Sequence, residues 1–248
     1  MRIYVGLLIS LAWGDSASSP CHRPCRGGVL GNLCVWAIGG CRVSRISTGG
    51  GILGRKYSQQ VFSEMQRFRN SSGNWCIDKN DKCYLVRNKT KIHFGRAQNL
   101  ICTVIMTNPG SYGLDMVRGW DDFQYGKGDS HLLQGIGFPD PTMRNIIWAI
   151  QSAYDLAQKE LPTGYLDVFN LSSVVCPKGE NASNYHEYVS QVLSANNISE
   201  DILVGTNIST EDGIRSVFEK SPFIITGFLR DTFKDKVHNL LSTSNKYN

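Results

Sequence analysis

The chain has 248 residues, of which 41% are hydrophobic and 19% are charged. This balance excludes a disordered or fibrous protein, and the length suits one substantial domain with appendages, because single cores stop growing near roughly 250 residues. The net charge of +5 is uneven: residues 1–100 carry 15 Lys and Arg against 4 Asp and Glu, whereas residues 101–248 carry 11 against 17. The acidic remainder argues against a nucleic-acid surface unless its cations cluster, and solvated charge is the plainer interpretation.

The first part of the chain differs from the rest in composition. Residues 1–64 are predicted to form a poorly structured basic N-terminal extension, and residues 65–248 to form an α/β domain. Residues 1–18 have the layout of a signal peptide, with one Arg, an apolar run and small residues at the end. The apolar run is too short for a membrane span, which needs about 20 residues.

Two interpretations of this extension stay open. A genuine signal peptide would make the protein a secreted glycoprotein, for which six N-x-S/T sequons, including Asn70, Asn88 and Asn181, offer acceptor sites. The alternative is a non-structural extension before a start at Met65, and the protein is then cytoplasmic, which is the expectation kept here. The sequence does not determine an oligomeric state.

The first organised segment begins at Trp75. Residues 75–78 and 83–88 flank the polar turn 79–82 and predict a β-hairpin. Residues 89–98 are expected to be a basic connection. Residues 100–107 form an almost continuous apolar run, as expected of a strand buried on both faces of a parallel sheet.

A turn, a long loop and a helix are predicted next. Asn-Pro-Gly at 108–110 ends the strand, and the polar, glycine-rich stretch 111–138 is long enough to be a loop that binds a ligand or covers a site. A helix then begins with Asp140 as N-cap and Pro141 at its first position, and it ends before Pro162.

The remaining elements alternate between strands and helices. Strands are predicted at 165–175 and 223–228, and helices at 184–195, at 211–219 and over FKDKVHNLLS after the last strand. Strands separated by helices imply right-handed crossovers. The predicted fold is therefore an α/β three-layer domain with a short parallel sheet flanked by helices and preceded by a β-hairpin.

Polar residues gather where ligands bind in such folds, beyond the carboxyl ends of the parallel strands. Asn108 follows the first core strand, Asn170 lies near the end of the second, and Asp140, Thr142 and Arg144 begin the helix after the long loop. We expect these residues to form one polar site beside a helix N-terminus, which favours anions. The alternative is a plain turn and a plain helix cap.

The sequence contains no motif typical of a catalytic serine, a P-loop or a helical zinc site. Ser130 and His131 are adjacent but lack the strained elbow of a catalytic serine. The chain has no P-loop, and His131, His186 and His238 lack the i, i+4 spacing of a helical zinc site. No cofactor and no metal are therefore expected.

Four segments in order, CYLVR, VIMTNPGS, DPTMRN and VFNLSS, together resemble a bacterial and phage family, the domain of unknown function sixteen-forty-three. The resemblance covers about Lys82 to Leu241 and implies mainly a fold, because that family has no settled activity. The family usually has Ser directly after the Pro, whereas here Gly110 precedes Ser111.

The Asn-Pro-Gly turn is also similar to a motif of the mismatch-specific branch of the uracil-DNA glycosylases. This resemblance implies that Asn108 positions a water against the sugar carbon of a flipped nucleotide, while Pro109, Gly110 and Ser111 shape and line the loop. Those enzymes carry a second loop after a fourth strand, and we expect it either to be missing by C-terminal truncation or never to have been present. Two functions follow: a glycosylase-like hydrolase or nucleotide-processing enzyme, and a non-catalytic module that binds a nucleotide or small anion.

Overall fold

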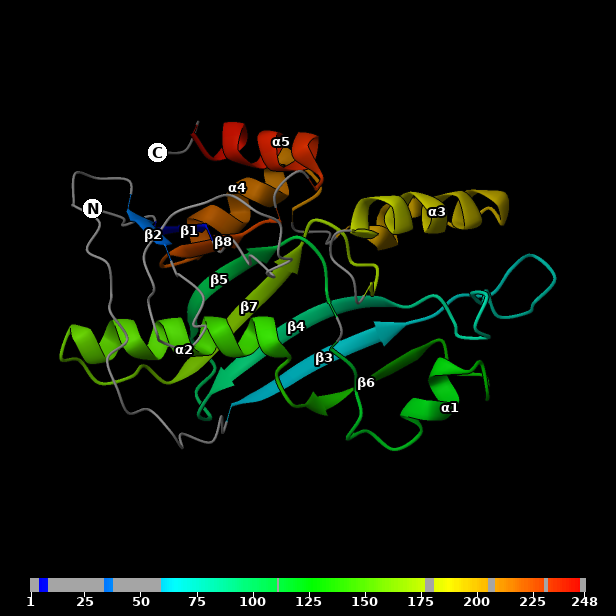
Figure 1. Ribbon diagram of the computed structural model, residues 1–248, viewed down its shortest axis with the longest axis horizontal. Helices are drawn as coiled ribbons and strands as arrows, with labels where there is room; N and C mark the ends of the chain where they lie inside the picture. The colour runs from blue at the N-terminus through cyan, green and yellow to red at the C-terminus, as the bar shows by residue number, and fades with distance from the viewer. Residues whose placement is uncertain are drawn as a thin grey trace, which may run out of the picture.

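The computed structural model describes residues 5–8, 34–37, 59–110, 112–176, 181–204, 208–229 and 232–245 (Figure 1). Apart from the two short strands that it includes, the predicted signal-like segment and N-terminal extension up to residue 58 lie outside the described residues. Ser111 lies outside them too.

The described chain forms an α/β fold flanked by helices, as the sequence predicts, but its six-stranded sheet is mixed and only three of its strands are parallel. The strand order is β6-β3-β4-β7-β5-β8, and β1 and β2 form a separate antiparallel pair. The strands are β1 Val5–Leu8, β2 Cys34–Ala37, β3 Gln60–Gln66, β4 Val86–Phe94, β5 Leu100–Met106, β6 Leu132–Gly137, β7 Gly164–Asn170 and β8 Ile224–Gly227.

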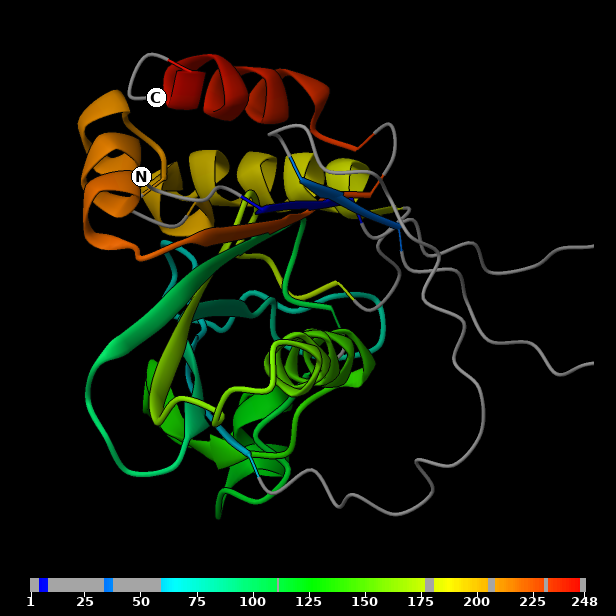
Figure 2. The ribbon, with the colours of Figure 1, turned by 90° about the vertical axis from the view of Figure 1, so that its left-hand side faces the viewer.

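Helices cover both faces of the sheet (Figure 2). The helices are α1 Trp120–Gln124, α2 Pro141–Leu156, α3 Ala182–Ala195, α4 Glu211–Lys220 and α5 Lys234–Asn245, with a 3-10 turn at Glu200–Leu203. Helix α2 lies on one face, and α3, α4 and α5 lie on the other. Strand β5 pairs in parallel with β7 and β8. Helices cover both of its faces, which explains its continuous apolar run.

Helix α2 begins where its sequence predicts. The Asp140 side chain accepts a hydrogen bond from the backbone N–H of Met143 at 2.8 Å, and Pro141 occupies the first turn. Ile146, Ile147 and Ile150 form a buried stripe against the sheet. The local cap and the apolar period therefore agree with the packing.

The antiparallel half of the sheet is larger than predicted. Residues 89–98 were expected to be a connection, but residues 89–94 belong to β4, and the expected loop 111–138 contains α1 and β6. Lys89 adopts a φ of 48° where the register of β3 and β4 shifts, so the alternating pattern of β4 is interrupted in the sequence. Strand β6, LLQGIG, is short and contains two glycines, which weakens its strand signal.

The sheet also includes residues 60–64, which were predicted to belong to the N-terminal extension, and Met65 is the sixth of the seven residues of β3. At the predicted hairpin, Ile77 and Cys83 form an isolated antiparallel bridge, and the N–H of Asp78 donates to the carbonyl of Lys82. The second arm of this turn leads directly into β4. Among the described residues, no helix is long and apolar enough to cross a membrane.

Candidate functional site at the carboxyl ends of β5 and β7

The candidate site lies where two neighbouring parallel strands send the chain to opposite faces of the sheet. After β5 the chain leads through α1 and β6 to α2, and after β7 it leads to α3 on the other face (Figures 1 and 2). Met106 pairs with Asn170, and just beyond the ladder the N–H of Ser172 donates to the carbonyl of Thr107 at 3.1 Å. Both loops therefore begin side by side, which is where open α/β sheets form a ligand crevice.

The Asn-Pro-Gly turn packs against the start of α2. Gly110 has a φ of 68°, a left-handed conformation that favours glycine, and a Cβ placed on it would lie 3.3 Å from Asp140 Oδ2. Pro109 is buried, and the half-buried Asn108 donates from Nδ2 to the carbonyl of Cys176 at 2.8 Å. The structure thus brings the Asn-Pro-Gly turn into contact with the start of α2, two segments that were predicted to be close only from the expected order of strands.

The N-terminus of α2 is occupied by a carboxylate of the chain itself. Asp140 Oδ1 accepts from the N–H of Met143, so the attraction of this helix end for anions is met internally. Thr142 is half-buried and Arg144 is exposed. A negatively charged ligand would therefore need a cation other than the helix end.

Asn170 is the last residue of β7, and only 4% of its surface is exposed. Its side-chain oxygen Oδ1 is buried and accepts no hydrogen bond from the described part of the chain. Because buried polar atoms almost always have a partner, an acceptor of this kind indicates a missing donor.

Arg87, the second residue of β4, was not predicted as a site residue. It is 3% exposed, and its backbone N–H donates to the carbonyl of Ser173 at 2.8 Å, beside the carboxyl end of β7. Its guanidinium carbon lies 5.0 Å from the centroid of the Tyr112 ring. Nε and Nη1 are buried and donate to no acceptor among the described residues.

The surroundings of Arg87 influence its charge. Burial lowers the pKa of the guanidinium to about 10, against the opposing effects of Asp140 and Tyr112, so Arg87 remains protonated at neutral pH. The hydroxyl of Tyr112 donates to the carbonyl of Val61 at 2.8 Å, and burial raises its pKa to about 12. Tyr112 therefore stays neutral and holds its ring in place.

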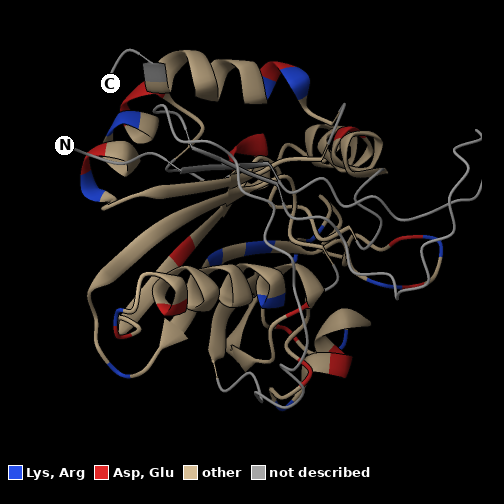
Figure 3. Cartoon of the chain, turned by 60° about the vertical axis from the view of Figure 1, so that its left-hand side comes forward, with Lys and Arg blue, Asp and Glu red and all other residues tan. Residues whose placement is uncertain are grey.

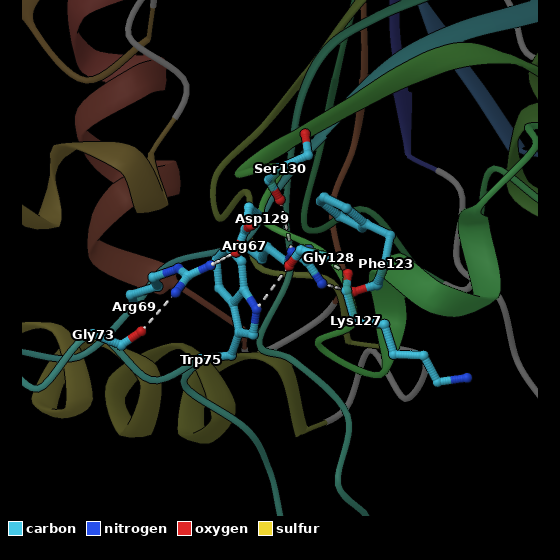
Figure 4. A network of polar contacts seen from close by, with 9 residues as sticks. All are labelled: Arg67, Arg69, Gly73, Trp75, Phe123, Lys127, Gly128, Asp129 and Ser130. Carbon is cyan, nitrogen blue, oxygen red and sulfur yellow. Dashed lines mark hydrogen bonds and ion pairs between the residues drawn. The ribbon is translucent and has the colours of Figure 1, made fainter.

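A second buried arginine shows what complete pairing looks like in this chain (Figure 4). Arg67 is 1% exposed and donates from all three of its nitrogens. The acceptors are the carbonyls of Ser130 at 2.9 Å, Phe123 at 2.7 Å, Lys127 at 2.8 Å and Gly128 at 3.0 Å. Arg67 therefore has a structural role, and the unpaired state of Arg87 is not a general property of buried arginines here.

Arg87 and Asn170 border a cleft of about 540 Å³, but their side chains lie on the other face of the sheet. Arg87 pairs with Met65 of the α2-side core, whereas Phe62 and Glu64 line the cleft. The cleft runs along β3, β4 and β7 to residues 201–204, and its more open part contains charges with partners. Lys89 pairs with Glu64 at 3.0 Å, and the Lys91 ammonium lies 4.3 Å from the centroid of the Tyr165 ring. Arg87 differs from these cations because its donors are unused.

One signal in the sequence points to Arg87. It ends the otherwise apolar run that begins at Cys83, so a charge stands at a position that the pattern assigns to a buried strand. Whether that charge is paired depends on distant carbonyls, which the sequence does not locate. Within the described residues, no group of three or more His, Cys, Asp and Glu could hold a metal ion.

Comparison of the chain with models of protein families, with curated proteins and with solved structures found no match. The resemblances to the domain of unknown function sixteen-forty-three and to the uracil-DNA glycosylases therefore stay predictions.

Proposed function

We propose that the protein binds a small polar ligand, of the nucleotide class, at the carboxyl ends of β5 and β7. The observation that carries this proposal is the buried Oδ1 of Asn170, which has no donor among the described residues at the carboxyl end of β7. An unsatisfied buried acceptor costs about 1–3 kcal/mol. A ligand with an N–H or O–H group would recover this cost on binding.

The distribution of charge favours a small ligand over a nucleic-acid duplex. Figure 3 shows acidic and basic segments interspersed over the helices and loops of the described chain. Affinity for a duplex depends on neutralising many phosphates with clustered cations. A single nucleotide requires only one or two such contacts.

Binding is tested by titrating nucleosides and nucleoside monophosphates while following the melting temperature and the heat of binding. The wild type should be stabilised by at least one of them, in proportion to RT ln(1 + [L]/Kd). Asn170→Leu should keep the fold and lose the ligand response, because it removes the acceptor without leaving a polar group unpaired.

The matched control is Asn145→Leu, which changes an exposed residue of α2 and should leave the response intact. Equal responses of Asn170→Leu and the wild type, or no response of the wild type to the whole series, would refute the proposal.

Glycosylase-like hydrolysis is a second candidate, favoured by the orientation of Asn108. Its Nδ2 is held by the Cys176 carbonyl, so Oδ1 remains as an acceptor that can orient a water. In such a reaction the oxygen of water joins the sugar carbon as the bond to the base breaks, and the released proton ends on the departing base. Asn108 would act by orienting the water, because an amide is not a strong base.

The hydrolytic candidate is tested with uracil- and mismatch-containing oligonucleotides, followed by alkali to reveal abasic sites. Cleavage that disappears in Asn108→Ala while ligand binding persists supports it. Absence of cleavage by a wild-type protein that binds nucleotides would leave the binding function and eliminate the enzymatic one.

A further inference from the structure

We propose that β6 is a dimerisation strand: the free edges of β6 in two copies of this chain pair antiparallel about Gln134 and join the two sheets into one. This inference goes beyond the proposed function and does not depend on it. It is carried by an edge strand that is apolar, uncharged and complementary to itself.

The first observation is that β6 ends the sheet (Figure 1). It pairs with β3 in a continuous register, and no strand among the described residues pairs with its other edge. The N–H of Arg67 donates to the carbonyl of His131, and bonded pairs alternate along an antiparallel ladder. The backbone groups of Leu132, Gln134 and Ile136 therefore point away from β3, toward the free edge.

The side chains at this edge are apolar and exposed. Leu132 is 41% exposed, Ile136 is 44% exposed, and Phe138, directly after the strand, is 69% exposed. The side chain of Val117 lies against Gly135, so the chain itself covers the face of β6 that Gly135 shares with α2. Because successive residues of a strand face opposite sides, Leu132 and Ile136 lie on the face that is left open.

The edge also lacks the features that keep edge strands from pairing. Charged residues, proline and bulges are the usual protection. Residues 132–138 contain no charged residue and no proline, and the register with β3 has no shift. The strand is therefore free to extend the sheet with a further strand.

A second copy of the chain is the partner that this edge fits, because the strand is complementary to itself. In an antiparallel pairing centred on Gln134, the two Gln134 residues exchange both backbone hydrogen bonds, and Leu132 of each copy lies opposite Ile136 of the other. The apolar side chains then pack together on the open face, and the two Gln134 amides can bond to each other. Sliding one strand by two residues would instead place Gln134 against Leu132 or Ile136.

The oligomeric state of the full chain is the first test. Analytical ultracentrifugation in a concentration series through the micromolar range should show a monomer–dimer equilibrium. Ile136→Lys places a charge beside Leu132 of the other copy, and it should weaken dimerisation by about tenfold or more without changing the circular dichroism spectrum. The matched control is Leu241→Lys, which alters a residue of α5 that is 46% exposed and should leave the equilibrium unchanged.

A second variant tests the contribution of the main chain. The N–H of Gln134 points away from β3, so Gln134→Pro removes a donor of the free edge without removing a hydrogen bond of the β3–β6 ladder. This variant should be monomeric at concentrations at which the wild type is dimeric.

Cross-linking tests the register. Residues of a bonded antiparallel pair have Cα atoms about 5.5 Å apart, within reach of a disulfide. Gln134→Cys should therefore form a covalent dimer on oxidation. The two copies of residue 132 would lie roughly 13 Å apart along the strands, so Leu132→Cys should cross-link no more than the wild type.

A wild type that stays monomeric throughout the series overturns the inference, as does a dimer that Ile136→Lys and Gln134→Pro leave intact. If either of these variants does not fold, the cross-link decides. Equal cross-linking of Gln134→Cys and Leu132→Cys would refute the pairing about Gln134.

Discussion

The guanidinium of Arg67 lies on the indole of Trp75, with its carbon 3.9 Å from the ring centroid (Figure 4). The ring of Phe123 lies 4.4 Å from the same carbon. This one side chain therefore joins the region after β3, the turn before β4 and the segment around α1. It holds together three parts of the antiparallel half of the sheet.

Replacing Arg67 with Met should lower the free energy of unfolding by about 3 kcal/mol, because one buried and three partly buried carbonyls lose a charged donor at once. Urea unfolding followed by circular dichroism measures the loss. Arg69→Met is the matched control, since its ion pair with Asp129 is exposed and should contribute less than about 1 kcal/mol. Similar losses in both variants would show that the Arg67 network does not have this structural role.

Replacing Gly110 with Ala should damage both stability and ligand binding. The φ of 68° imposes a cost of about 1–2 kcal/mol on a non-glycine residue, and the new methyl group lies against Asp140. Gly73→Ala is the control, since Gly73 has a φ of 81° and open space around it. Both variants should lose similar stability in urea unfolding, but only Gly110→Ala should bind ligand more weakly.

The N-cap of α2 offers a test of stability. Asp140→Ala should cost about 1 kcal/mol, as should Thr210→Ala, whose hydroxyl accepts from Gly213 N–H at the start of α4. The difference between the two losses, measured in urea, reports the contribution of the Asp140 charge beside Arg87. A loss at Asp140 well below that at Thr210 would show that the carboxylate is unfavourable in the unliganded protein.

The free energy of unfolding should decrease as the pH is lowered, because His186 becomes protonated. Its Nδ1 lies 2.8 Å from Ser172 Oγ and its Nε2 lies 3.2 Å from the Lys236 ammonium, while Glu200 acts in the opposite direction. Burial, and then Lys236, lower the histidine pKa to about 4. Between about pH 6.5 and pH 4 the unfolded chain binds the proton more readily, so this stability is lost as pH falls through that window.

The expected loss is about 1–2 kcal/mol, because solvent reaches part of the site and screens the interaction. Unfolding in urea at a series of pH values measures it. His186→Gln should flatten the profile in this window, whereas His238→Gln, which alters an exposed residue of α5, should not. An unchanged profile in His186→Gln would exclude this histidine as the source.

Local signals predicted α2, α3, α4, α5 and the parallel half of the sheet because their determinants are close in sequence. The Asp140 cap and the Ile146, Ile147 and Ile150 stripe define the start and buried face of α2 within a few residues. The antiparallel half depends on pairing across long separations, as when β3 lies between β4 and β6. The bulge at Lys89 and the glycines of β6 interrupt the alternation of apolar and polar residues by which strands are predicted from sequence.

The sequence by itself determined that an Asn-Pro-Gly turn follows a buried strand and that a capped helix begins after the next long segment. Only the tertiary structure decided that Gly110 rests against Asp140 and that Arg87 and Asn170 retain unused, buried polar atoms. The physical reason is that a turn or a cap is satisfied by neighbouring residues. Whether a buried charge is satisfied depends on every segment that packs around it, as the different surroundings of Arg67 and Arg87 demonstrate.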